Sequence, residues 1–195
     1  SSLSNQLTDT VFNNFVNNHD LDNSTGDQIA FVGRVSREKG PDSFMALAAH
    51  LPEINFHVYG DGPQFDELQQ SGLTNLQLHG QQDDMSLLWK NIGLLVMPSR
   101  YEGLPMAALE AMARGIPVLA FNVGALHRLI KPQWNGWLIE PENIAELTQQ
   151  ITQWSHFSKQ HKLLLQLSCN NTIKKRFSSD IAIPELLKSY QQVSV

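Results

Sequence analysis

Short apolar runs alternate with helix-sized segments along most of this 195-residue chain. The runs predict β-strands at 29–32, 54–59, 76–79, 93–97, 117–121 and 137–139. Between them, helical patterns or gaps of helical length lie at 41–51, 63–70, 84–91 and 105–114. Strands and helices that alternate at this spacing are typical of βαβ units, which build a parallel sheet covered by helices on both faces. We therefore predict a three-layer α/β fold with about six parallel strands and a ligand beyond the carboxyl ends of those strands.

The two ends of the chain depart from this alternation. Residues 1–28 are rich in Asn, Ser, Asp and Thr, and we expect them to be a linker from an N-terminal domain that this sequence does not contain. After residue 143 no further strand is indicated, and helices are expected at 143–157, 158–177 and 184–193. The predicted organisation is a linker over 1–28 and one domain over 29–195.

Composition narrows the possible functions. The chain is 42% hydrophobic and 17% charged, as globular proteins are, and its net charge of −5 argues against a nucleic-acid partner. The single cysteine, Cys169, excludes an intrachain disulfide and fits a reducing compartment. The seven histidines show no ligand spacing, so no metal is expected. No apolar run is long enough to cross a bilayer, and we expect a cytoplasmic protein.

The segment 93–118 is the most informative part of the sequence. An apolar strand leads into a polar loop, then into a helix expected to start at Pro105 and stop at Gly115, and then into another strand. The first N–H groups of that helix, at Met106 and Ala107, have no partners within it, and the helix macrodipole is positive there. This helix end is therefore expected to hold an anion such as a phosphate.

Two carboxylates flank the expected anion site. Glu102 lies in the loop and Glu110 in the helix, and along a helix they would be about 12 Å apart at about 1.5 Å per residue. That distance is too long for a shared proton or for the paired carboxylates of a glycoside hydrolase. The spacing suits one extended ligand, with an anionic centre over the helix end and a hydroxyl-rich group toward each carboxylate.

The same residues carry a resemblance to a known family. The run Pro-Ser…Glu-Gly-Leu-Pro…Glu-Ala-Met-Ala…Gly-Ile-Pro-Val-Leu-Ala at 98–120 resembles the Glu-x7-Glu signature of retaining nucleotide-sugar glycosyltransferases of the GT4 type. The resemblance implies a Rossmann-like domain that forms the C-terminal half of a GT-B enzyme. It also implies that Glu102 belongs to the catalytic site, near the transferred sugar, and that Glu110 binds the ribose hydroxyls. The donor-binding residues that it adds are Gly103, Leu104, Pro105 and Met106.

A basic loop is expected beside these carboxylates. The first strand ends in Gly33-Arg34, and Lys39 follows before the next helix, so both cations lie at the carboxyl end of that strand. The planar donors of arginine and the compact charge of lysine suit a diphosphate, although solvated side chains explain basic loop residues equally well. Gly-Arg-x4-Lys-Gly is similar to the donor-diphosphate loop of the family. The resemblance therefore implies a donor site that includes Gly33, with Arg34 and Lys39 stabilising the leaving diphosphate.

Two further positions are secondary candidates. Gly60 closes the second strand in a Gly-x-Gly run that a tight turn explains, and in the family the backbone here comes close to the nucleotide. His79 lies at the end of the third strand, in a segment that resembles the one contacting the base.

The sequence departs from the family pattern in two places. Pro105 removes one N–H that could contact phosphate, which leaves Leu104, Met106 and Ala107 as donors. Arg128 replaces an acidic residue that is common in the family, so any support that the acidic side chain would give the site is missing here.

The resemblance leads to a specific expected function. We expect a domain that binds a nucleotide-diphosphate sugar, linked to UDP, GDP or ADP, in a retaining glycosyltransferase that transfers a hexose-type sugar without a metal or other cofactor. An N-terminal acceptor domain would complete the cleft, so this fragment alone is expected to be inactive. The Glu-Gly-Leu-Pro subgroup often builds bacterial surface polysaccharide or lipopolysaccharide, which places the expected enzyme in the cytoplasm, with peripheral attachment to the inner face of the membrane through the missing half.

Two alternatives differ in class. The first is a catalytically degenerate nucleotide-sugar-binding or interaction module, for which Arg128 is the only support in the sequence. The second is a dinucleotide-dependent oxidoreductase, which ranks lower because no Gly-x-Gly-x-x-Gly follows the first strand.

Overall fold

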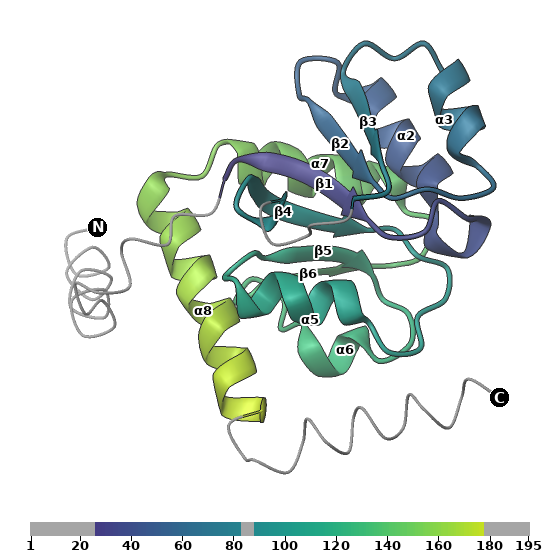
Figure 1. Ribbon diagram of the computed structural model, residues 1–195. Coiled ribbons are helices and arrows are strands. Elements are labelled where there is room, and N and C mark those ends of the chain that lie inside the picture. The colour runs from purple at the N-terminus through teal and green to yellow at the C-terminus, as the bar shows by residue number, and fades with distance from the viewer. Residues whose placement is uncertain (1–25, 83–87, 178–195) are drawn as a thin grey trace, which may run out of the picture.

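The computed structural model describes residues 26–82 and 88–177, and it confirms the predicted α/β architecture. Six parallel strands form one sheet in the order β3-β2-β1-β4-β5-β6 (Figure 1). The strands are β1 (Gln28–Val32), β2 (Phe56–Tyr59), β3 (Leu76–Gly80), β4 (Ile92–Met97), β5 (Val118–Phe121) and β6 (Gly136–Ile139). The largest difference from the predicted strand bounds is at β2, which begins at Phe56 rather than at residue 54. The Ile54 N–H instead donates to the Leu51 carbonyl in a turn that precedes the strand.

Most of the helices lie where the sequence pattern predicts them. The helices are α2 (Pro41–His50), α3 (Phe65–Gln70), α5 (Met106–Ala113), α6 (Leu126–Leu129), α7 (Ile144–Ser155) and α8 (Lys159–Phe177), with a 3-10 turn η1 (Arg37–Lys39). Neither η1 nor α6 was predicted, because three or four residues are too few to show a helical period. The expected helix at 184–193 lies outside the described residues, as do residues 84–87 of the expected helix at 84–91 and residues 1–25 of the expected linker over 1–28.

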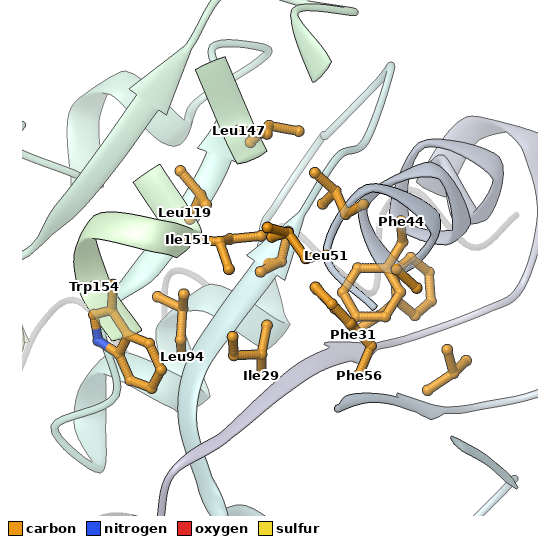
Figure 2. Close-up of a cluster of buried hydrophobic side chains, with 14 of the residues drawn as sticks. Ile29, Phe31, Phe44, Leu51, Phe56, Leu94, Leu119, Leu147, Ile151 and Trp154 are labelled. Carbon is orange, nitrogen blue, oxygen red and sulfur yellow. The ribbon is translucent and has the colours of Figure 1, made fainter. Parts of the chain in front are cut away.

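One face of the sheet packs against α2 and α7. Phe44 of α2 contacts Phe31 of β1 and Phe56 of β2, with ring centroids 5.7 and 5.5 Å apart. Figure 2 shows this cluster together with Ile151 and Trp154 of α7, and all of these side chains are buried. The buried apolar area on this face is a main source of the domain's stability.

The opposite face packs against α5, α6 and the middle of α8. Ala108, Ala111 and Met112 of α5 are fully buried, and the two alanines allow the helix to lie close to the strands. Cys169 of α8 is buried in the same cluster, and burial raises the pKa of its thiol. Because both faces are covered, β4 is buried along its whole length, which explains its uninterrupted apolar sequence.

The strand order determines where a ligand can bind. The chain leaves β1 toward β2 on one side, and it leaves β4 toward β5 on the other, although β1 and β4 are neighbours. The loops after these two strands therefore diverge, and this arrangement creates a crevice at the carboxyl edge of the sheet. Within the described residues, no helix has both the length and the apolar character needed to span a membrane.

Candidate functional site

A pocket of about 220 Å³ lies at the carboxyl ends of β1 and β4. Five of the predicted donor-site residues line it, which are Gly33, Lys39, Glu102, Leu104 and Met106. The remaining wall includes Ser99, Ala107 and the last residues of the two strands. The structure therefore brings together the two loops that the sequence singled out, although more than sixty residues separate them along the chain.

A partly buried ion pair occupies one side of this pocket. Lys39 Nζ lies 2.9 Å from Glu102 Oε1, and Ser99 Oγ donates to the same oxygen at 2.7 Å. The Glu102 side chain is 2% exposed, whereas the Lys39 side chain is 32% exposed. The carboxylate is thus fixed by two hydrogen bonds, while the lysine keeps an open side from which a ligand can approach.

Ser99 is a site residue that sequence reasoning did not identify. It lies at the end of the buried apolar run and three residues before Glu102. Its hydroxyl has one hydrogen to donate, and this hydrogen bond to Glu102 Oε1 helps to hold the carboxylate in place. The available signal was a serine only three residues before a predicted site glutamate. Nothing in the sequence showed that this serine, which follows the apolar strand, would itself be buried.

The helix end differs in detail from the prediction. Helix α5 begins at Met106, and Pro105 precedes it with φ −80° and ψ 70°, so the proline is not the first helical residue. This turn brings the Leu104 carbonyl to the Met106 N–H, which donates to it at 2.9 Å. An anion at this end would therefore depend on the N–H groups that follow, beginning with Ala107, which lines the pocket.

The other predicted residues do not line this pocket. Gly60 lies beside Gly33, because a Cβ atom at Gly60 would be 1.9 Å from the Gly33 carbonyl oxygen. Glu110 is half-buried on α5, and its backbone carbonyl accepts a hydrogen bond from Arg114 Nη1. The predicted residues outside the pocket wall are Arg34, Gly60, His79, Gly103, Pro105 and Glu110.

His79 belongs to a row of stacked rings on β2 and β3. Its Nε2 lies 3.0 Å from His57 Nδ1, and its ring stacks on Tyr59 with centroids 4.3 Å apart. The Tyr59 hydroxyl donates to Gln28 Oε1 at 2.7 Å. Burial lowers the pKa of both histidines, and the charge of His79 lowers that of His57 further. The pair is therefore neutral at physiological pH, with one ring donating to the other.

We expect the free energy of unfolding to decrease as the pH falls below about 6.5, the ordinary histidine pKa. The unfolded chain takes up protons in this range, whereas the lowered pKa values of folded His57 and His79 delay their protonation. Urea unfolding at pH 7.5 and 5.5 measures the loss. His57→Gln should reduce it, whereas His50→Gln, at an exposed position on α2, should leave it unchanged. Equal losses in the wild type and in His57→Gln would contradict this assignment.

The segment that departs from the family pattern lies against the site. A Cβ atom at Gly124 would be 1.9 Å from the Glu102 carbonyl oxygen, so the loop before α6 supports the Glu102 loop directly. Arg128 lies on α6 and is exposed. Across the described parts of the chain, no three His, Cys, Asp or Glu side chains gather as metal ligands would. Whether the reaction needs a metal stays a prediction from sequence.

Comparisons with known proteins relate this geometry to a family. The family model for glycosyl transferases group 1 matches residues 15–171. An uncharacterized glycosyltransferase of Methanocaldococcus jannaschii is 28% identical over 170 residues, which cover 84% of this chain and 48% of that protein. A UDP-Gal:alpha-D-GlcNAc-diphosphoundecaprenol alpha-1,3-galactosyltransferase of Escherichia coli is 31% identical over 125 residues, 58% of this chain and 32% of that protein.

A solved structure shows the same fold. TarM of S. aureus, as a variant in complex with Fondaparinux, alpha-GlcNAc-glycerol and UDP, matches with a TM-score of 0.76 and 24% identity. The match covers 85% of this chain and 36% of that one. This chain spans about half the length of the first curated relatives that it matches.

Proposed function

Because this chain belongs to the glycosyl transferases group 1 family, we propose that its pocket between β1 and β4 binds a nucleotide-diphosphate sugar as the donor site of a retaining hexosyltransferase. The observation that supports this most strongly is the Lys39–Glu102 pair beside the first turn of α5. It combines a partly exposed cation, a helix N-terminus and a fixed carboxylate, and these suit the diphosphate and the sugar of one ligand.

The chemistry of the proposed reaction follows from where charge develops. When the bond between the sugar and the diphosphate breaks, negative charge increases on the leaving phosphate oxygen. Lys39 and the α5 end would stabilise that charge, with Arg34 as a further donor, which is electrostatic catalysis. Glu102 would lie toward the sugar, and Glu110 would bind the ribose. The pocket of about 220 Å³ is too small for a whole nucleotide sugar, so the base and ribose would extend along the crevice.

The relatives support a choice of donor and acceptor. The E. coli relative takes its sugar from UDP-Gal by name, and the TarM complex contains UDP, so UDP is the first nucleotide to test, with GDP and ADP as alternatives. The same relative acts on a diphosphoundecaprenol-linked sugar by name. We infer a role in bacterial surface polysaccharide or lipopolysaccharide synthesis, in the cytoplasm at the inner face of the membrane, with the acceptor held by a further N-terminal domain. This chain alone would then bind the donor but transfer little or no sugar.

Calorimetric titration of this domain with UDP, GDP and ADP tests the donor site. We expect one nucleotide to bind in preference to the others. Arg34→Ala and Glu110→Ala should each weaken that binding by about tenfold, since each removes a hydrogen bond that involves a charged group. Binding of none of the three nucleotides would count against a donor site in this domain. Unchanged affinity in both variants would show that the nucleotide lies elsewhere.

A degenerate nucleotide-sugar-binding module is the second candidate. Its support is the Gly124 to Arg128 segment, which departs from the family pattern and lies against the Glu102 loop. Joining this domain to the N-terminal half of a relative separates the two proposals. Tight donor binding without sugar transfer in that chimera would favour the degenerate module.

A further inference from the structure

We propose that Arg100 is a positioning residue for the donor site, because it ties together the loops after β1, β4 and β6 and so fixes Lys39 against Glu102. This inference rests on the proposed function, since it assigns to Arg100 a role in the same site.

The Arg100 guanidinium binds two carboxylates from distant parts of the chain. Its Nη1 and Nη2 lie 2.8 Å from the two Asp42 carboxylate oxygens, at the first turn of α2. Its Nε lies 2.8 Å from Glu142 Oε1, in the loop between β6 and α7. Paired parallel hydrogen bonds of this kind restrict an arginine to one orientation. Arg100 itself follows β4, so the first turn of α2, the loop after β4 and the loop after β6 meet at this side chain.

The backbone around Arg100 is joined to η1, the turn that carries Lys39. Arg100 Nη1 donates to the Arg37 carbonyl at 2.9 Å, and the Arg100 N–H donates to the Glu38 carbonyl at 2.8 Å. The Tyr101 N–H approaches the same Glu38 carbonyl at 3.4 Å. The residues just before Lys39 are thus bound to the residues just before Glu102. This connection sets the distance between the two charged groups of the pocket.

The charge of Arg100 is not available to a ligand. Asp42 and Glu142 compensate it, and the resulting hydrogen bonds raise the pKa of Arg100 and lower that of Asp42. Arg100 also does not line the pocket. Ion pairs that are partly exposed, as these are, contribute little to stability. A small displacement of a ligand-binding group, in contrast, can change function by a large factor. The main effect of Arg100 is therefore expected on the geometry of Lys39.

A double-mutant cycle in donor binding tests this. Arg100→Gln should weaken the binding of UDP by about tenfold in calorimetric titration, but it should have less than about a twofold effect when Lys39→Gln is already present. Arg37→Gln is the matched control, because it removes a positive charge from the same turn and keeps the carbonyl that Arg100 contacts. We expect its affinity to stay within about twofold of the wild type. Equal losses from Arg100→Gln in both backgrounds, or no loss in either, would overturn the proposal.

Amide hydrogen exchange in the free protein provides a second readout that needs no ligand. Arg100→Gln should speed exchange at residues 100 and 101 by about tenfold relative to Arg37→Gln, because these amides donate to Glu38. Asp42→Asn combined with Glu142→Gln should act in the same direction and serves if Arg100→Gln fails to fold. Unchanged exchange would overturn the positioning role even if the nucleotide binds. If exchange were faster in Arg100→Gln but the wild type bound no nucleotide, the proposed function would be contradicted. The role of Arg100 in joining the loops would still be supported.

Discussion

Lys39→Gln is expected to weaken the binding of a nucleoside diphosphate by about 10- to 100-fold, because a hydrogen bond to a charged group contributes about 1.5–3 kcal/mol. A second effect acts in the same direction. Without Lys39, the buried Glu102 carboxylate loses its positively charged partner and repels the phosphate charge. Calorimetric titration with the preferred nucleotide measures the loss.

Two further variants separate the causes of this loss. Lys131→Gln removes one positive charge from an exposed position before β6, at the opposite edge of the sheet, and should have little effect on binding. Adding Glu102→Gln to Lys39→Gln removes the repelling carboxylate and should restore part of the affinity. Wild-type affinity in Lys39→Gln would rule out Lys39 as a diphosphate ligand.

Gly40→Ala is expected to lower the free energy of unfolding more than any of the other proposed substitutions. Gly40 joins η1 to α2 with φ +69°, and a Cβ atom there would be 2.0 Å from the Pro98 carbonyl oxygen. The substitution therefore forces apart the two loops that form the pocket. We expect a loss of about 3 kcal/mol or more in the free energy of unfolding, together with weaker nucleotide binding. Urea unfolding gives the first quantity and calorimetry the second.

Gly72→Ala is a close control for this variant. Gly72 has φ +68°, almost the same as Gly40, but apart from Gly72 and the residues on either side of it, no atom lies within 4 Å of the position of a Cβ atom. Its substitution should cost about 1 kcal/mol, from the left-handed conformation alone, and should not change nucleotide binding. If the two variants lost equal stability, the close contact with Pro98 would not be the cause of the larger effect.

The sheet could be predicted from the sequence because its signal is local. The sequence of β4 is apolar over six consecutive residues and is followed by a loop and a helix. This pattern can be recognised without knowing which distant residues contact the strand. The pairings inside the site have no local pattern. Lys39 and Glu102 are 63 residues apart, and Arg100 is 58 residues from Asp42 and 42 residues from Glu142. Only the folded structure shows which of these charged side chains pair with one another.

The family resemblance supplied part of what local pattern did not. It directed attention to Lys39 and Glu102 before any contact between them was known. It gave no role to Arg100, which lies outside the matching residues, and none to Ser99, which is part of the matching run but has no function attached to it there. It also did not give the start of α5, where the backbone at Pro105 turns out of the helical region and moves the first helical residue to Met106.

The strand order also has a consequence for folding. β1 pairs with β2, and β4 with β5, through connections of about twenty residues, whereas β1 pairs with β4 only after a much longer loop has closed, with Ile29 opposite Leu94. Closing that loop costs more chain entropy than forming either neighbouring unit. The pocket lies between β1 and β4, so its walls come together late in folding. A nucleotide that contacts the loops after both strands would favour the complete six-stranded sheet over any species in which only β1–β3 or only β4–β6 have paired.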